Sequence, residues 1–409
     1  MARILQLIVL LLVTLFGYSV VADDDFELWK AQFRETATKA GIRPDVLDMA
    51  FTGVLPDKKV LNLDAHQPEF TRQVWEYLAD TTSDERVQLG RQRLAEQGDL
   101  LSRITARYGV GEAYLAAIWG MESSFGKQTG DYSVIRSLAT LTYAGREERR
   151  DFWAGQLLAA LRIIQRGDMN LTELRGSWAG AIGHTQFIPT TFEAYAVDFD
   201  GDGQRDLRNS IADALASTAH YLAESGWQTG QDWGEEISLP EDFDWLLADP
   251  KVQKGAQAWT RENRVLPVSG DLLAGGGEES GFIYLPAGYR GPAFVLYQNF
   301  SVILKYNKSN SYALAVGLLA DLLRGKQGVV AEWPHEDVAL SHAEKSELQL
   351  LLSVAGYNTE GVDGKIGPNT QSALRDWQAD VGFPPDGYAT VEHLKLLRRQ
   401  VEVQAKTTE

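Results

Sequence analysis

The chain has 409 residues, of which 44% are hydrophobic and 23% charged, and its formal net charge is −17. This length suffices for two or three domains, and the excess of acids over bases (56 against 39) disfavours nucleic acid as a partner, because phosphate binding needs clustered Lys and Arg. The absence of cysteine excludes disulfides and a thiol nucleophile, and 6 scattered histidines disfavour a multi-histidine metal centre. Carboxylates and aromatic rings are left as the main chemical groups, which favours carbohydrate chemistry.

The N-terminal residues 1–22 have the pattern of a secretory signal peptide. Arg3 precedes an apolar run from Ile4 to Phe16, and Val20 and Ala22 occupy the small-residue positions before a cleavage site. We favour cleavage over a retained anchor, because the apolar run is shorter than the about 20 residues that a spanning helix needs. The sequence therefore predicts export to the periplasm without stable membrane insertion.

Apolar and aromatic residues recur at helical spacing from residue 23 to about 235, with short glycine-bearing turns between them. Residues 236–300 are richer in proline and glycine and contain two strand-like runs, 282–285 and 294–297. A helix is predicted at about 310–324 and a linker at 329–345, and residues 346–400 are predicted to form a small helical domain of their own. The expected fold class is mainly α with a small β insertion.

Residues 116–126, AAIWGMESSFG, contain a single acid, Glu122, among apolar neighbours. Such surroundings remove water from a carboxyl, which favours its neutral form and raises its pKa, as a general acid requires. The alternative is an acid at a helix edge that reaches solvent.

Further along, residues 176–189 (GSWAGAIGHTQFIP) combine glycines that allow close approach of a ligand with Ser177 and Gln186 as hydrogen-bonding groups for a sugar. By itself this second segment could equally be a packing turn.

These two segments, together with the Tyr306–Asn307 pair before a helix, resemble the membrane-bound lytic transglycosylase B family, which cleaves peptidoglycan. The resemblance covers about residues 25–325 and implies a catalytic region at 23–328 with a goose-type lysozyme-like helical core at about 100–235, wrapped by a helical domain. It implies that Glu122 is the sole catalytic acid and base. The residues that it implies for the glycan groove are Ser177, Gln186, Tyr221, Tyr306 and Asn307. For Tyr221, packing in the core is an equal alternative, and membrane attachment is not implied, because the lipid-carrying cysteine of some members is absent.

Residues 198–206, DFDGDGQRD, fit the first half of an EF-hand loop, with acids at loop positions 1, 3 and 5 and glycine at position 6. Position 12 is Asn209 where a full EF-hand loop has a bidentate Glu. The family resemblance suggests that Asp213 closes the site instead. The expected ligands of a structural calcium ion are thus Asp198, Asp200, Asp202, the backbone carbonyl of Gln204, and Asp213. A solvated acidic turn is the alternative, and no cofactor is expected for the chemistry.

Residues 357–370, YNTEGVDGKIGPNT, precede a helical segment that contains Trp377 and resemble the small three-helix peptidoglycan-binding domain of many wall enzymes. The alternative is a helical cap without a ligand. We prefer wall binding, because a domain tethered by a linker raises the local concentration of an enzyme on a polymeric substrate.

The resemblance implies non-hydrolytic cleavage of the MurNAc–GlcNAc β-1,4 bond, which leaves 1,6-anhydroMurNAc ends. Two hypotheses compete with it. A hydrolytic muramidase would use Asp131 or Asp151 as a second carboxylate, and a catalytically silent scaffold would only bind the wall. The expected partners are peptidoglycan glycan strands, with other cell-wall enzymes as an open possibility.

Overall fold

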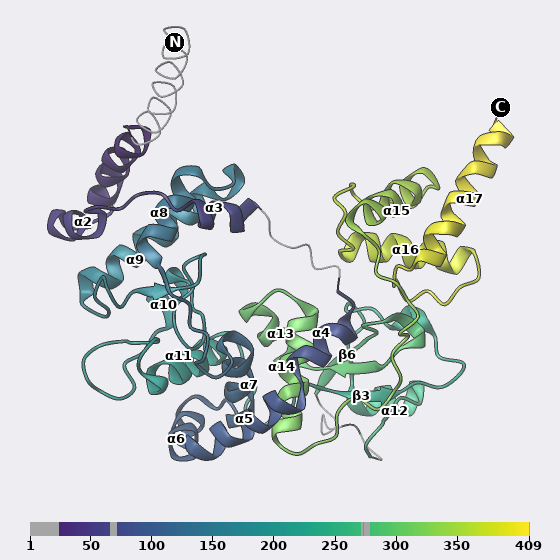
Figure 1. Cartoon of the computed structure of the whole chain (residues 1–409). Helices are drawn as coiled ribbons and strands as arrows, with labels where there is room; N and C mark the ends of the chain where they lie inside the picture. The colour runs from purple at the N-terminus through teal and green to yellow at the C-terminus, as the bar shows by residue number, and fades with distance from the viewer. Residues whose placement is uncertain (1–23, 66–71, 271–272, 274–278, 409) are drawn as a thin grey trace, which may run out of the picture. The chain divides into compact units, whose positions relative to one another are not determined.

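The structure is a computed structural model that describes residues 24–65, 72–270, 273 and 279–408 (Figure 1). The predicted signal peptide lies outside these residues. None of the helices in the described ranges is both long enough and apolar enough to cross a membrane.

The chain forms two compact units. The first unit comprises the described parts of Met1–Pro68 and Trp119–Tyr221, and the second unit those of Glu69–Ile118 and Leu222–Glu409. Helix α7, Glu112–Ser123, begins in the second unit and ends in the first. Its residues 113–120 are all buried, as expected for a helix that is apolar on every face.

The first unit is built around α9, Arg150–Arg166. Leu157, Leu161 and Ile164 bury one face of α9, and Gly167 ends the helix at a φ of 82°. Two helices, α8 (Val134–Ala144) and α10 (Pro189–Tyr195), pack against α9. The other elements of this unit are the helix at 24–39, α2 Pro44–Phe51, α3 Lys58–Ala65, η1 Glu147–Arg149, α11 Ile211–Glu224 (which ends in the second unit), and the paired strands β1 Tyr132–Ser133 and β2 Arg175–Gly176.

The second unit contains an antiparallel sheet with the strand order β4-β6-β7-β3-β5. Its strands are β3 Gly234–Ser238, β4 Lys254–Gly255, β5 Leu266–Pro267, β6 Ser280–Tyr284 and β7 Ala293–Leu296. Strands β6 and β7 overlap the two strand-like runs of the sequence, 282–285 and 294–297, and Phe282 pairs with Leu296 across them. The predicted β insertion is therefore confirmed, and Trp259 and Ile283 lie in the core beside it.

Helices complete this part of the second unit. They are α4 Val74–Thr81, α5 Asp84–Glu96, α6 Gly98–Tyr108, α12 Ala256–Asn263, α13 Gln298–Tyr306 and α14 Asn310–Leu323, with the 3-10 turns η2 Trp245–Leu247 and η3 Gly288–Arg290. Helix α14 confirms the helix predicted at about 310–324. Its Gly317 lies so close to Trp233 that an added Cβ would fall 2.2 Å from the indole ring, so only glycine fits there.

The C-terminal residues form three helices around their own core, as the sequence predicts. The helices are α15 His342–Val354, α16 Pro368–Asp380 and α17 Val391–Thr408 (Figure 1). Leu348, Leu374, Trp377 and Leu397 are buried between them. A capping box of Ser341 with Glu344 begins α15, so the helix starts before the predicted domain boundary at 346.

The segment expected to be a linker contains no helix or strand at residues 329–341, but it contacts the rest of the second unit at several points. The Glu236 carboxylate accepts hydrogen bonds from the backbone N–H groups of Val330 (2.7 Å) and Ala331 (2.8 Å). Trp333 packs on Trp75 with ring centroids 6.0 Å apart. These contacts hold the segment against the rest of the second unit.

Candidate active site

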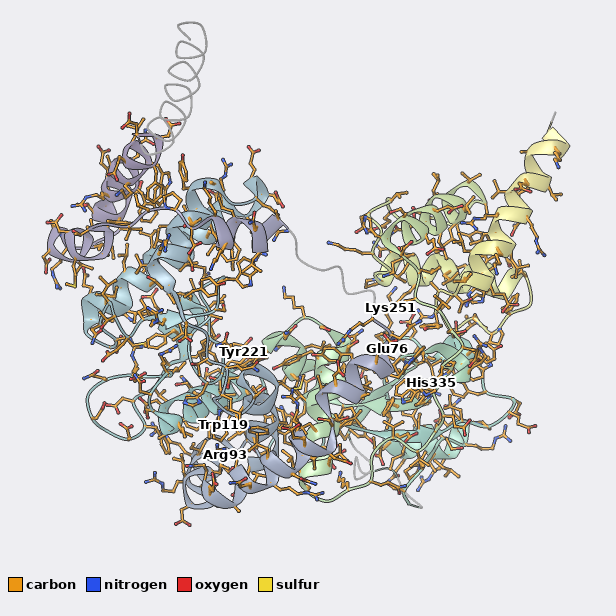
Figure 2. The ribbon with its side chains drawn as sticks, in the orientation of Figure 1. Glu76, Arg93, Trp119, Tyr221, Lys251 and His335 are labelled. Atoms are coloured by element: carbon orange, nitrogen blue, oxygen red, sulfur yellow. The ribbon has the colours of Figure 1, made fainter. Side chains whose placement is uncertain are left out.

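Glu122 lies in the last turn of α7 and is half-buried. The residues before it, from Ala113 to Gly120, are the buried run of the helix, and Trp119 is 1% exposed (labelled in Figure 2). The helix is therefore buried along most of its length, and near its end it holds a carboxyl that solvent can partly reach. Glu122 thus lies at a helix end, as expected from the sequence, and its catalytic role stays a prediction.

The chain leaves α7 through three consecutive residues in the left-handed region. Ser124, Phe125 and Gly126 have φ values of 49°, 58° and 85°. Two of them are not glycine, and such conformations are strained and frequent at functional sites. Glycine is needed at 126, because an added Cβ would lie 2.4 Å from the His184 ring. This turn ends helix α7 just after Glu122 and changes the direction of the chain.

Ser123 ties this turn to the second predicted segment. Its buried hydroxyl donates to the backbone carbonyl of His184 (2.6 Å) and accepts from the backbone N–H of Gly126 (2.9 Å). The Trp119 indole N–H in turn donates to His184 Nδ1 (3.0 Å). The structure thus brings together the two sequence segments that were predicted to act as one site.

The glycine-rich segment folds back on itself in a compact loop. Isolated bridges pair Ile182 with Gly176 and with Phe187. An added Cβ would lie 2.0 Å from the Ala181 carbonyl at Gly176, so the close approach depends on the absence of a side chain. The Ser177 hydroxyl accepts a hydrogen bond from the backbone N–H of Ala181 (3.0 Å), which holds this residue half-exposed at the start of the loop.

Gln186 adopts a left-handed conformation with a φ of 53°. Its side-chain amide nitrogen donates to the backbone carbonyls of Gly183 (2.8 Å) and Thr129 (3.2 Å). Because both amide hydrogens have backbone acceptors, the side-chain oxygen is the group that can accept a hydrogen bond from a ligand. Gln186 is thus held in place by its amide nitrogen, and its side-chain oxygen can accept a hydrogen bond from a ligand.

Tyr221 lies on α11, half-buried, in an aromatic cluster (labelled in Figure 2). Its ring meets those of Tyr195 and Phe187 edge to face, at centroid distances of 4.9 Å and 6.0 Å. This packing fits both alternatives, a groove wall and a core tyrosine, so its role stays a prediction. Tyr306 ends α13 and Asn307 follows it, and both belong to the second unit, whereas the other predicted site residues belong to the first.

The two acids considered for a hydrolytic mechanism are exposed to solvent. The side chain of Asp131 is 87% exposed and pairs with Arg208 at 2.9 Å. Asp151 is exposed in the first turn of α9. Neither resembles Glu122 in its environment.

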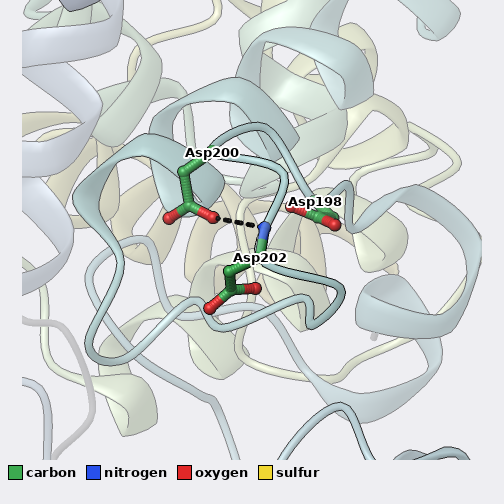
Figure 3. Close-up of side chains that lie close together, drawn as sticks. All are labelled: Asp198, Asp200 and Asp202. Atoms are coloured by element: carbon green, nitrogen blue, oxygen red, sulfur yellow. Dashed lines mark hydrogen bonds between the residues drawn. The ribbon is translucent and has the colours of Figure 1, made fainter.

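The Asp-rich loop brings three carboxylates together (Figure 3). One oxygen of each of Asp198, Asp200 and Asp202 lies within 4.8 Å of the others. Within the loop, Asp198 accepts from the backbone N–H of Gly201 (2.6 Å) and Gly203 (2.9 Å), which shapes the turn. Oxygen donors gathered at this spacing suit a hard divalent cation.

Asp213 lies under this loop and is 1% exposed. It accepts hydrogen bonds from the backbone N–H groups of Phe199 (2.8 Å) and Asp206 (2.9 Å). Burial raises the pKa of Asp213 above its ordinary value, while these backbone hydrogen bonds oppose the rise. Asp213 also accepts from the backbone N–H of Asp200 (3.4 Å), so it braces the loop, and it is not one of the three acids whose oxygens the structure gathers.

Three residues that assemble the site were missed in the sequence: Trp119, Ser123 and His184. Their signal was present, because Ser123 and His184 are polar residues inside strings of apolar and small ones. Only their contact across the fold shows what they do.

The chain matches two family models. One is the transglycosylase SLT domain, over residues 25–321, and the other is the putative peptidoglycan binding domain, over residues 341–397. The chain is also 30% identical over 223 residues to the membrane-bound lytic murein transglycosylase B of Escherichia coli (strain K12), in a match covering 53% of this chain and 58% of that protein. The match therefore spans less than two thirds of that curated relative.

Solved structures are similar as well. The SltB3 structure from Pseudomonas aeruginosa in complex with NAG-anhNAM-pentapeptide is 50% identical, with a TM-score of 0.88 over 91% of this chain and 99% of that chain. The Escherichia coli lytic transglycosylase Slt35 in complex with calcium is 25% identical, with a TM-score of 0.62 over 72% of this chain and 92% of that chain. These likenesses confirm the fold class predicted from the sequence.

Proposed function

The chain belongs to the transglycosylase SLT domain family, and from this premise we propose that it cleaves the MurNAc–GlcNAc β-1,4 bond of peptidoglycan and leaves 1,6-anhydroMurNAc ends. The observation that carries the proposal is the half-buried Glu122 at the end of the buried helix α7, with its neighbour Ser123 bonded to the glycine-rich loop. The periplasm is the proposed place of action.

In this mechanism a single carboxyl serves twice. Neutral Glu122 protonates the glycosidic oxygen as the bond to C1 breaks, and the cation-like sugar is stabilised by its own acetamido group. The ionised Glu122 then accepts the proton of the MurNAc 6-hydroxyl, whose oxygen attacks C1. Because the substrate supplies the nucleophile, no second carboxylate is needed, in contrast to the usual pair of a glycosidase.

The proposed glycan contacts come from residues that the fold holds rigidly. Gln186, fixed by two backbone carbonyls, offers an acceptor to a sugar hydroxyl or acetamido N–H. Ser177 offers its hydroxyl, and Tyr221 an aromatic edge. Tyr306 and Asn307 are proposed as further contacts from the second unit.

Wall binding and metal binding complete the proposal. The three-helix domain would hold the enzyme on peptidoglycan, as its match to the putative peptidoglycan binding domain supports. Asp198, Asp200, Asp202, the Gln204 carbonyl and Asp213 would hold a structural calcium ion, for which the Slt35 complex with calcium is the precedent. The ion has no part in the chemistry.

Mass spectrometry of the sugars released from purified sacculi tests this function. The expected products carry anhydro ends and are one water lighter than the products of hydrolysis. Dominant reducing-end MurNAc would instead support a hydrolytic muramidase. Absence of any release by a folded protein that still binds sacculi would support the silent scaffold.

A further inference from the structure

A polar cavity of about 290 Å³ lies in the second unit, between the turn that follows α11, the start of β6 and the start of α13. Its polar lining consists mainly of glutamines and one acid: Gln228, Gln231, Gln253, Gln298 and Glu279. Phe282 and Leu296 add an apolar wall. We call this cavity the Glu279 pocket. None of its residues takes part in the mechanism proposed above.

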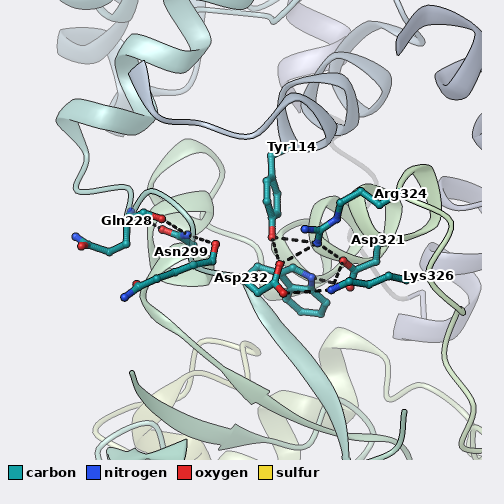
Figure 4. A network of polar contacts seen from close by, with 9 residues as sticks. Tyr114, Gln228, Asp232, Asn299, Asp321, Arg324 and Lys326 are labelled. Carbon is teal, nitrogen blue, oxygen red and sulfur yellow. Dashed lines mark hydrogen bonds and ion pairs between the residues drawn. The ribbon is translucent and has the colours of Figure 1, made fainter. Parts of the chain in front are cut away.

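The glutamines make the pocket rich in acceptors. The amide nitrogen of Gln228 (shown in Figure 4) donates to the backbone carbonyl of Gly226 at 3.1 Å. The amide nitrogen of Gln253 donates to the carbonyl of Pro250 at 3.2 Å. Each of these nitrogens has a second N–H, and the side-chain oxygens of both residues can accept hydrogen bonds from a ligand. A ligand that donates hydrogen bonds would match them.

Glu279 has a carboxylate oxygen, Oε1, that is buried without a hydrogen-bond partner among the described residues. Its sequence neighbourhood supplies no cation, because residues 265–289 contain no Lys, Arg or His. Burial, followed by the nearby negative charges of Asp232 and Glu235, raises the pKa of Glu279 to about 7. A buried acceptor of this kind is costly unless a donor or a cation reaches it.

The two acids near Glu279 already have partners. Asp232 pairs with Arg324 at 3.0 Å and Lys326 at 3.2 Å and accepts from the Tyr114 hydroxyl at 3.0 Å (Figure 4). Glu235 accepts from the Tyr297 hydroxyl at 2.8 Å. The two cations beside Asp232 are paired with it, and the partner of Glu235 is a neutral hydroxyl. Glu279 is therefore the acid that an incoming positive charge would satisfy.

We propose that the Glu279 pocket binds a primary ammonium group of a peptidoglycan stem peptide, the free amine of its diamino acid. Glu279 would receive the charge, the oxygens of Gln228 and Gln253 would accept the remaining N–H bonds, and Phe282 and Leu296 would cover the methylene stem. A divalent cation fits less well, because it prefers several carboxylates and the pocket offers one among neutral amides. The identity of the ligand rests on the proposed function, whereas the preference for an ammonium rests on the pocket alone.

The test measures binding to the full chain carrying Glu122→Gln, so that no substrate is consumed. The probes are a disaccharide pentapeptide with the free diamino-acid amine and the same compound with that amine acetylated, compared by calorimetry at pH 8. The free amine should bind about tenfold or more tightly, as expected for a hydrogen bond to a charged group. Adding Glu279→Gln should abolish the preference, and Glu241→Gln, an exposed acid of the same unit, should leave it intact.

Equal binding of the two probes to the parent protein would overturn the proposal. So would competition by millimolar magnesium or calcium without an amine preference, which would assign the pocket to a metal. If Glu279→Gln does not fold, Gln253→Leu at an exposed position provides the check, since loss of one acceptor should weaken the preference several-fold. Failure of the wild type to release anhydro products from sacculi would refute the proposed function but not the amine preference.

Discussion

The hydroxyl of Ser123 donates a 2.6 Å hydrogen bond to the backbone carbonyl of His184, and this bond joins the helix of the proposed catalytic acid to the glycine-rich loop. Ser123 is 1% exposed, so both the donor and the acceptor are shielded from water. The same hydroxyl accepts from Gly126, which begins the path away from the helix. One side chain therefore sets both the end of α7 and its distance from the loop.

Ser123→Ala should lower the free energy of unfolding by about 1–3 kcal/mol, because the His184 carbonyl and the Gly126 N–H would lose a buried partner. It should also lower kcat more than it raises KM, since Glu122 would be less well positioned. Chemical denaturation and turnover of sacculi would measure the two effects. The matched control is Ser238→Ala at an exposed position of β3, and equal behaviour of the two variants would contradict the bracing role.

Glu122→Gln should reduce turnover by about 10²–10⁴-fold or more while the fold is kept, because an amide has the shape of the acid but cannot donate and then accept a proton. Product release from sacculi and circular dichroism are the measurements. Glu112→Gln at the other end of α7 is the control and should remain active. Near wild-type turnover by Glu122→Gln would refute the single-acid mechanism.

Calcium should raise the melting temperature through the Asp-rich loop. Exported calcium sites bind with dissociation constants of about 10⁻⁴–10⁻³ M, so about 10 mM calcium should stabilise the protein by about 1.4–2.7 kcal/mol. Thermal unfolding with calcium and with chelator would be compared for the wild type and for Asp200→Ala with Asp202→Ala. The control pair is Glu241→Ala with Glu332→Ala, which removes the same charge from exposed positions. If calcium stabilises all three proteins equally, or none, the loop is only an acidic turn.

The stability of the protein should depend on pH through Glu279. Its pKa is about 7 in the folded protein against 4.5 for the ordinary carboxyl, so the folded state binds more protons than the unfolded state between these values. The free energy of unfolding should therefore fall as pH rises through this window. Glu279→Gln should flatten the dependence and be the more stable protein at pH 8. Denaturation at pH 5, 6.5 and 8 would show this, and an unchanged slope in the variant would argue against the raised pKa.

A fragment of residues 338–409 should co-sediment with purified sacculi and not with cellulose. It should begin before residue 341, because Ser341 caps α15 and Leu340 is buried in the core of the three helices. In the whole chain Arg375 pairs with Asp249 at 2.9 Å, so the domain also contacts the rest of the second unit. A folded fragment that stays in the supernatant would leave packing as the role of these helices.

The sequence foretold those features that depend on local pattern. The strands at Phe282 and Phe294 followed from runs of aromatic and branched residues, and the place of Glu122 near the end of a buried helix followed from the apolar run before it. These patterns need no knowledge of distant parts of the chain, since each residue type carries its own preference for strand, helix or burial.

Other features depend on contacts between distant residues and could not be foreseen. Glu236 accepts a hydrogen bond from the backbone of Val330, 94 residues away, and so holds the segment predicted as a linker against the rest of the second unit. The left-handed conformation of Phe125 is also unusual for its residue type, and its buried ring packs against Trp119 and Gly120. The Glu279 pocket is likewise lined by residues from four separate parts of the chain.

The pairing of Ser123 with His184 also has a meaning for how the protein is made. Chains are synthesised from the N-terminus, so Glu122 and its helix exist before the loop that contains His184 has been added. A chain that ends early therefore carries the acid without the carbonyl and the glycine-rich loop that complete its surroundings.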